Sequence, residues 1–439
     1  MIRLLDKSFI STFSYFYLLL MFIYAGGATT FSRGLGNIAT FANTLAIMLT
    51  VFFVIKHSIK FTVRYYVSIF VFLIYAFITS INNGIINPLW ISGWIIWITI
   101  TYCICSFFQR KIFVAIETIM FQLCVIGFVC WLIECIEPEL MRTIASFLEF
   151  SQPFEKECNV DMNMLVYTIG NKEIFTEYAI LLRNPGFTWE PGVFSCLICL
   201  AIFCNILRSN FEIKGNLPLW VFLATLFSTQ STTGFMILII MIIGYLILNK
   251  KYFKLLVLVP ILIIIFQLPF VQDKMFAEYE NIGVVDLNDL STKEGHALGR
   301  MYSFVLCWEE FLRHPIIGLG GWSKGTKLVA EGFDNIYLIS GVGKLLAMYG
   351  IIMTLLFVKL LLMSAKTMCK MFSVNGWLIV VVIIGMMISY DLWMTPIFMM
   401  CWLYGYYIKV STNTNQRSID YTSISTDKST DKSTDKQEC

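Results

Sequence analysis

Charged side chains are scarce in this sequence. Asp, Glu, Lys and Arg make up 14% of the 439 residues, whereas hydrophobic residues make up 58%. A soluble domain of this length would need far more polar surface to remain in solution, so the composition excludes that class. Long apolar stretches instead recur between residues 9 and 408. Each is near the roughly 20 residues that a helix needs to cross a bilayer. The composition therefore predicts an all-α, polytopic integral membrane protein.

Histidine is also scarce, and metal-binding patterns are missing. The chain has 3 His and 13 Cys, and no Cys/His spacing resembles that of a zinc site. Most Cys lie within apolar stretches, where we expect them to act as small hydrophobic side chains. Cys158 and Cys307 lie between such stretches, and their pairing is left open. We expect no metal ion and no cofactor. Because the net charge of +3 is spread over many loops, no nucleic-acid partner is expected either.

Lys and Arg cluster on every second loop, as in Arg110-Lys111 and Lys250-Lys251. Such clusters mark the cytoplasmic side of a membrane protein. Both termini are then cytoplasmic, and we expect the first apolar stretch to be a retained helix and not a cleaved signal. About twelve membrane spans are predicted, near residues 9–28, 37–55, 63–81, 89–108, 112–136, 192–207, 217–231, 233–249, 254–270, 343–364, 374–389 and 392–408.

The membrane domain is expected to comprise residues 1–408 and to carry two large exterior loops, near 137–191 and 271–342. Loops this long are usually functional or disordered. Their aromatic and apolar residues favour folded loops, which places the chemistry of interest on the exterior face. Residues 409–439 form a polar tail with three STDK repeats. Because such a sequence cannot bury apolar area, we predict a disordered cytoplasmic tail.

The segment RNPGFTWEPGVF, residues 183–194, combines charge with the start of an apolar stretch. In one interpretation it is a helix start, because Pro191 suits the first helical position and Glu190 suits the positive end of the helix dipole. In the other it is an anion site. The guanidinium of Arg183 offers a planar fork of donors, and the helix start offers free N–H groups. Glu190 would then orient Arg183 or act on an acceptor hydroxyl.

A second segment, residues 298–322, predicts an amphipathic helix that begins near Arg300. Its apolar face would either lie on the exterior membrane surface or pack against the spans. His314-Pro315 ends the helix. The following turn contains Gly318 and Gly320, which would allow backbone N–H groups to face an anion. The residues of the apolar face are Met301, Phe304, Val305, Trp308, Phe311 and Leu312.

Two shorter segments complete a pattern. TQSTTG, residues 229–234, places hydroxyls between two spans, and Asp334-Asn335 precedes another span. In chain order the motifs are R-x-x-G-F-x-x-E-P, T-x-S-T-T-G, G-R, H-P-I-x-G-x-G and D-N-x-Y-L. This order, on the exterior side, resembles the O-antigen polymerase family and the related O-antigen ligases. The motifs cover about residues 180–350, and the hydropathy pattern extends over the whole chain.

The resemblance implies an integral-membrane glycosyltransferase of the lipid-linked, GT-C type. The donor would be a glycan on undecaprenyl pyrophosphate, which a polymerase transfers to a lipid-linked repeat unit and a ligase transfers to a lipid A core. Ligases tend to carry His-Asn where this chain has Asp334-Asn335, so the polymerase is favoured. The implied partners are the lipid-linked oligosaccharide, membrane lipid, a flippase and a chain-length regulator. A flippase of lipid-linked oligosaccharide is the alternative from another class, but no repeat relates the two halves of the chain.

The resemblance and the chemistry together suggest site residues. Arg300 and Arg183 would stabilise the pyrophosphate leaving group in the absence of a metal ion. Glu190 or Asp334 would act as the base for the acceptor hydroxyl. The remaining candidates would contact substrate, namely His314, Asn335, Gly318 and Gly320.

Overall fold

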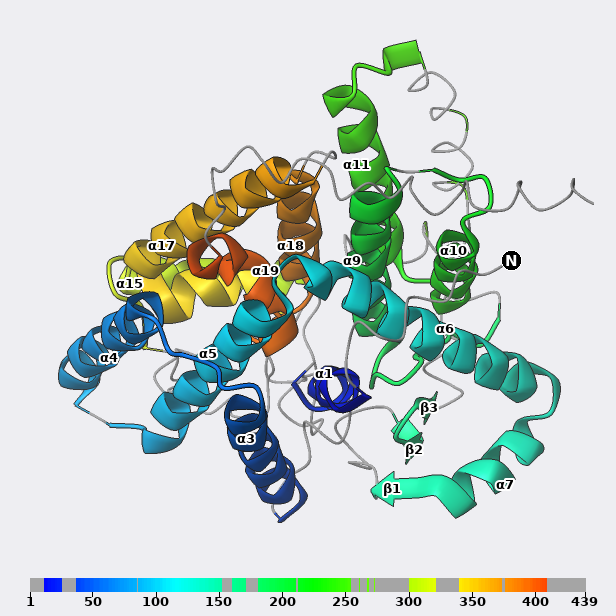
Figure 1. The fold of residues 1–439 in the computed structure, drawn as a ribbon, viewed down its shortest axis with the longest axis horizontal. Helices are drawn as coiled ribbons and strands as arrows, with labels where there is room; N and C mark the ends of the chain where they lie inside the picture. The colour runs from blue at the N-terminus through cyan, green and yellow to red at the C-terminus, as the bar shows by residue number, and fades with distance from the viewer. Residues whose placement is uncertain are drawn as a thin grey trace, which may run out of the picture. The chain divides into compact units, whose positions relative to one another are not determined.

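The computed structural model describes residues 12–25, 37–84, 86–151, 160–170, 181–210, 212–253, 300–320, 339–372 and 376–408, with isolated positions at 260, 267 and 272. Helices dominate this part of the chain (Figure 1). The longer ones are α1 (Thr12–Ala25), α3 (Asn37–Lys56), α4 (Val63–Asn83), α5 (Pro88–Phe108), α6 (Ile112–Ile136), α7 (Pro138–Leu148), α9 (Pro191–Ser209), α10 (Leu217–Thr229), α11 (Thr232–Leu248), α15 (Arg300–Arg313), α17 (Gly341–Met371), α18 (Leu378–Ser389) and α19 (Pro396–Tyr407).

The helices support a membrane-embedded protein. Four helical segments of the described chain are long and apolar enough to cross a membrane, namely Val63–Asn82, Pro88–Ile136, Pro191–Ser209 and Gly341–Met371. Every predicted span contains a described helix except 254–270, which lies almost entirely outside the described residues. Several of these helices are shorter than a full span. The number of spans therefore stays a prediction, as does the cytoplasmic tail, since residues 409–439 lie outside the described part.

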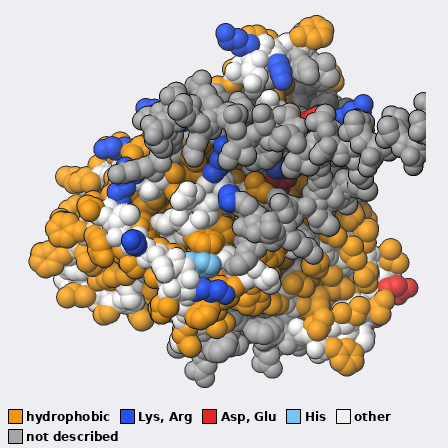
Figure 2. Space-filling model, in the orientation of Figure 1, with side chains coloured by type: hydrophobic (Ala, Val, Ile, Leu, Met, Phe, Trp, Pro, Cys, Tyr) orange, Lys and Arg blue, Asp and Glu red, His pale blue; other side chains and the backbone are white. Residues whose placement is uncertain are grey.

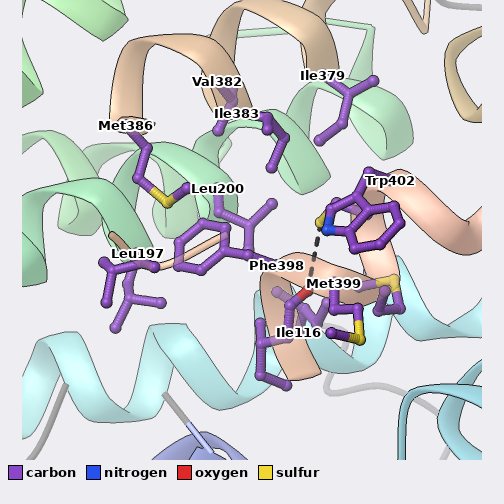
Figure 3. Packing of buried hydrophobic residues seen from close by; sticks show 14 of the residues in the cluster. Ile116, Leu197, Leu200, Ile379, Val382, Ile383, Met386, Phe398, Met399 and Trp402 are labelled. Atoms are coloured by element: carbon purple, nitrogen blue, oxygen red, sulfur yellow. Dashed lines mark hydrogen bonds between the residues drawn. The ribbon is translucent and has the colours of Figure 1, made fainter. Parts of the chain in front are cut away.

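Helix α9 lies at the centre of the helical core. It packs against α6, α10, α11 and α18 (Figure 1). Within the protein, 89% of the most apolar stretch of α9 is buried, compared with 22% of the corresponding stretch of α4. A helix that is hydrophobic all round needs partners on every side, whereas an outer membrane helix faces lipid. Figure 3 shows Leu197 and Leu200 of α9 together with Ile116, Ile383 and Phe398 of the surrounding helices. The start of α9 is thereby fixed inside the protein.

Hydrophobic side chains also cover much of the visible surface (Figure 2). On α4, for example, Phe70 is 63% exposed, Phe77 67% and Ile81 66%. Large contiguous apolar patches are unusual on soluble proteins and mark surfaces that face lipid or another protein. The exposed apolar helices therefore agree with the class of protein that the composition predicts.

The loop predicted near 137–191 contains three short strands within an otherwise helical protein. After α7, three antiparallel strands pair in the order β1-β2-β3, with β1 at Glu149–Ser151, β2 at Val160–Met164 and β3 at Tyr167–Gly170. Strands β2 and β3 share a small hydrophobic cluster with α6 and α7. The buried Tyr167 phenol donates to the carboxylate of Glu134 on α6. Burial raises the pKa of Tyr167 well above its ordinary value, so the phenol keeps the proton that it donates.

Candidate functional site

Residues 181–190 form a tightly anchored segment before α9. The Trp131 indole donates to the carbonyl of Leu182 at 2.6 Å, and the backbone N–H of Asn184 donates to the carbonyl of Ser228 at 3.0 Å. The N–H of Thr168 in β3 donates to the carbonyl of Gly186 at 2.8 Å. Hydrogen bonds with α6, α10 and strand β3 thus fix the position of this segment.

The helix-start interpretation of this segment is confirmed for the backbone. Pro191 occupies the first turn of α9, and Glu190 is the residue before the helix, with extended φ and ψ of −148° and 137°. The Glu190 side chain does not cap the helix. Its Oε1 atom accepts a hydrogen bond from the Tyr390 hydroxyl at 2.8 Å. The Nε atom of Arg183 donates to the carbonyl of Thr229 at 3.3 Å, and the orientation of Arg183 by Glu190 stays a prediction.

Tyr390 links two of the predicted site residues. Its hydroxyl donates to Glu190, and the same oxygen accepts a hydrogen bond from Nη2 of Arg300 at 3.2 Å. The Arg300 guanidinium carbon also lies 5.5 Å from the centre of the Tyr390 ring, within the range of a cation–π contact. Three segments far apart in sequence therefore meet at one phenol. We define the Tyr390 cluster as Glu190, Arg300 and Tyr390.

Two glycines allow Tyr390 to approach the starts of two helices. A Cβ atom at Gly192, in the first turn of α9, would lie 1.7 Å from the Tyr390 hydroxyl oxygen. A Cβ atom at Gly341, the first residue of α17, would lie 2.3 Å from the Tyr390 carbonyl oxygen. Real Cβ atoms essentially never come this close to another atom, so any other residue at either position would require the neighbouring atoms to shift.

Residues of the TQSTTG segment also reach this region. Thr233 in the first turn of α11 shares a hydrogen bond of 2.8 Å with Ser389, the residue before Tyr390. Ser231 caps α11 and accepts a 3.0 Å hydrogen bond from Ser195 of α9. The first turns of α9, α11 and α17 therefore converge around Ser389 and Tyr390. Such turns present backbone N–H groups and the positive end of the helix dipole, which favour anions.

A second charged pair lies beside the cluster. Lys344 in the first turn of α17 forms a 3.1 Å ion pair with Asp391, and both side chains are mostly buried. Sequence reasoning missed Lys344, Tyr390 and Asp391. The available signal was the tripeptide SYD at 389–391, where polar residues follow directly on a predicted span. The ion pair fastens the first turn of α17 to the residues after α18.

Helix α15 confirms the amphipathic helix that the sequence predicts, and Arg300 is its first residue. Its buried positions are Ser303, Cys307 and Glu310, which face α17. The side chains of the apolar face are exposed or half-buried, with Trp308 at 43% exposure. This arrangement favours the membrane-facing interpretation over packing against the spans, because the polar and small side chains are the ones that contact the protein.

Cys307 is a buried free thiol in this helix. Burial raises its pKa to about 12, with a smaller opposing effect of Lys344. Cys158, whose pairing with Cys307 the sequence leaves open, lies outside the described residues.

His314 and the glycine turn lie away from the Tyr390 cluster. They follow the far end of α15, which at 1.5 Å per residue puts His314 about 20 Å from Arg300. The N–H of Gly318 donates to the His314 carbonyl at 3.0 Å, and the N–H of Leu319 donates to the Ala347 carbonyl at 3.0 Å. These two N–H groups are thus used within the protein, and the contact of Gly318 and Gly320 with substrate stays a prediction. Gly320 is buried and has a positive φ of 70°.

The turn instead packs against a kink in α17. Gly350 has φ 65° and ψ −177° inside that helix. A Cβ atom at Gly318 would lie 2.5 Å from the Gly350 nitrogen, and one at Gly350 would lie 2.4 Å from the Ile316 carbonyl oxygen. The two glycines therefore permit direct contact between backbones. We assign this turn a structural function.

The other predicted site residues are not placed by the structure. Asp334 and Asn335 lie outside the described residues. Within the described ranges, no three His, Cys, Asp or Glu side chains gather in a way that could hold a metal ion. No family model, curated protein or solved structure shows a significant similarity to this chain.

Proposed function

We propose that this protein is a membrane-embedded glycosyltransferase that polymerises a surface polysaccharide from undecaprenyl-pyrophosphate-linked repeat units. The observation that carries the proposal is the Tyr390 cluster, in which Arg300 and Glu190 are joined by one phenol beside the first turns of three helices. A cation, a carboxylate and helix N-termini are the groups that an anionic leaving group and a hydroxyl nucleophile require. The proposed substrates are those that the resemblance to O-antigen polymerases implies.

The proposed reaction is a transfer at the anomeric carbon of the donor glycan. The acceptor hydroxyl oxygen forms a bond to that carbon while the bond from the carbon to the pyrophosphate oxygen breaks. The electron pair leaves with the lipid pyrophosphate, whose charge Arg300 stabilises with the help of the nearby helix N-termini. The hydroxyl proton passes to a carboxylate, for which Glu190 and Asp334 are the candidates. Arg183 supplies a second cation on the segment that leads into α9.

Deleting the protein tests the reaction class. We expect surface lipid that bears single repeat units and no ladder of longer chains on a polysaccharide gel. A core without any repeat unit, together with lipid-linked polymer in the membrane, would instead identify a ligase. Loss of repeat units from the exterior face would identify a flippase. An unchanged ladder would exclude all three activities.

Topology reporters test the proposed exterior site. Reporters fused near Glu157 and near Glu294 should register outside the membrane, and one at Ser423 should register inside. The expectation follows from the alternation of basic loops. A cytoplasmic signal from either long loop would place the site on the wrong side for a lipid-linked donor exposed to the exterior.

A further inference from the structure

Tyr390 holds the two charged members of the cluster through a single atom. Because the 3.2 Å contact from Arg300 Nη2 and the 2.8 Å contact to Glu190 Oε1 share the phenol oxygen, the two charged atoms are at most 6.0 Å apart. A tyrosine hydroxyl has one hydrogen to donate and lone pairs to accept. It therefore satisfies the carboxylate and the guanidinium at the same time.

The phenol stays protonated in this position. Burial, followed by the nearby Glu190 carboxylate, raises the pKa of Tyr390 well above its ordinary value. A neutral hydroxyl can donate to Glu190 without adding a negative charge next to Arg300. It also keeps apart two opposite charges that would otherwise attract one another.

The backbone around Tyr390 fixes the position of the hydroxyl. The first turn of α9 approaches the phenol at Gly192, and the first turn of α17 approaches the Tyr390 carbonyl at Gly341. The neighbouring residues are fastened as well, Ser389 to Thr233 of α11 and Asp391 to Lys344 of α17. The hydroxyl is thus positioned from several elements and not by its own hydrogen bonds alone.

We propose that Tyr390 is a positioning residue whose hydroxyl holds Arg300 and Glu190 as a bridged pair. Without the hydroxyl, Arg300 and Glu190 close into a direct ion pair, and Glu190 neutralises the cation that the leaving group requires. The role rests on the proposed function only for the identity of the anion, a lipid pyrophosphate. It predicts that loss of the Glu190 charge compensates for loss of the Tyr390 hydroxyl.

Inorganic pyrophosphate is a probe that does not depend on the polysaccharide. We expect it to raise the melting temperature of the purified full-length protein in detergent, as a ligand of the native state does. Arg300→Ala should remove this stabilisation, which locates the probe at the cluster. In Tyr390→Phe the pyrophosphate concentration for half-maximal stabilisation should rise about tenfold to a hundredfold, the range for a hydrogen bond to a charged group. Tyr252→Phe, at a tyrosine that is 59% exposed, serves as the matched control.

The double variant Tyr390→Phe/Glu190→Gln decides between positioning and other roles. If Glu190 captures Arg300 in Tyr390→Phe, removing the carboxylate charge should recover at least several-fold tighter pyrophosphate binding. A merely structural tyrosine would give no such recovery. The proposal is overturned if the double variant binds no better than Tyr390→Phe. It is also overturned if Tyr390→Phe binds like the wild type, or if pyrophosphate fails to stabilise the wild type.

The polysaccharide ladder reports on the proposed function separately. Each variant is expressed at equal membrane level in a deletion strain. Tyr390→Phe, which should bind pyrophosphate more weakly than the wild type, should then also make less of the polysaccharide ladder. A deletion strain with an unchanged ladder would overturn the proposed function, and the pyrophosphate comparison would still decide the role of Tyr390.

Discussion

Gly192→Ala is a direct test of how the Tyr390 phenol reaches the start of α9. The new methyl group would lie 1.7 Å from the phenol oxygen and 2.6 Å from the ring carbon that bears it. In a close-packed interior, the ring or the helix turn must move by more than about 1 Å to relieve this contact. The movement separates the phenol from Glu190 Oε1, which now accepts its hydrogen bond at 2.8 Å.

The expected loss of stability follows from three contributions. A hydrogen bond to a charged group contributes about 1.5–3 kcal/mol, and overpacking of a filled site costs about 1–3 kcal/mol. Alanine in a helix offsets up to about 1 kcal/mol, because it restricts the unfolded chain more than glycine does. The free energy of unfolding should therefore fall by about 1.5–6 kcal/mol, and the polysaccharide ladder should be lost with the displaced phenol.

Gly93→Ala is the matched control. Gly93 also lies within a helix, but a Cβ atom there would meet nothing within 4 Å. Thermal unfolding of both purified full-length variants in detergent, and the ladder in complemented cells, provide the comparison. If Gly192→Ala unfolds at the same temperature as Gly93→Ala and makes the same ladder, then the close approach of Tyr390 to α9 is wrong.

Three further outcomes are expected. Arg300→Ala should reduce polymer formation about a hundredfold at normal membrane level, through loss of about 3 kcal/mol of charge stabilisation. Arg300→Lys should retain only part of the polymer formation, and Glu309→Ala, at an exposed position, should leave polymer formation nearly unchanged. Wild-type polymer from Arg300→Ala would remove Arg300 from the site. Arg208→Ala should lower the unfolding free energy by about 2–4 kcal/mol, because it leaves the buried Glu117 carboxylate without its 2.7 Å ion pair. Adding Glu117→Gln should recover part of that loss, and an additive double variant would contradict this reasoning. Burial holds the pKa of Cys307 at about 12. At pH 8 its thiol should therefore react with maleimide at least about a hundredfold more slowly in the native protein than in the unfolded protein. Equal rates in the two states would show that the thiol is accessible.

Local sequence was sufficient to predict most helices of this protein. Helices α9 and α15 could be predicted because their signals depend only on neighbours along the chain. These signals are an apolar stretch, a proline at the first helical position and an amphipathic period. The order of short motifs also pointed to Arg300 and Glu190, which the structure brings within one hydrogen-bonded cluster. Hydropathy could not reveal the strands β1–β3, because they are short and lie in a loop whose fold depends on packing against α6 and α7.

The tertiary structure alone decided which side chains share the site. Tyr390 lies 200 residues from Glu190 and 90 residues from Arg300 along the chain, and no local pattern encodes such a contact. Lys344 is likewise separated by 47 residues from Asp391. The same packing brings the Gly318 backbone against the kink of α17, a contact that no local pattern predicts. The sequence thus determined where polar residues interrupt the apolar stretches. The close packing of α9, α15, α17 and α18 determined which of those polar residues contact one another.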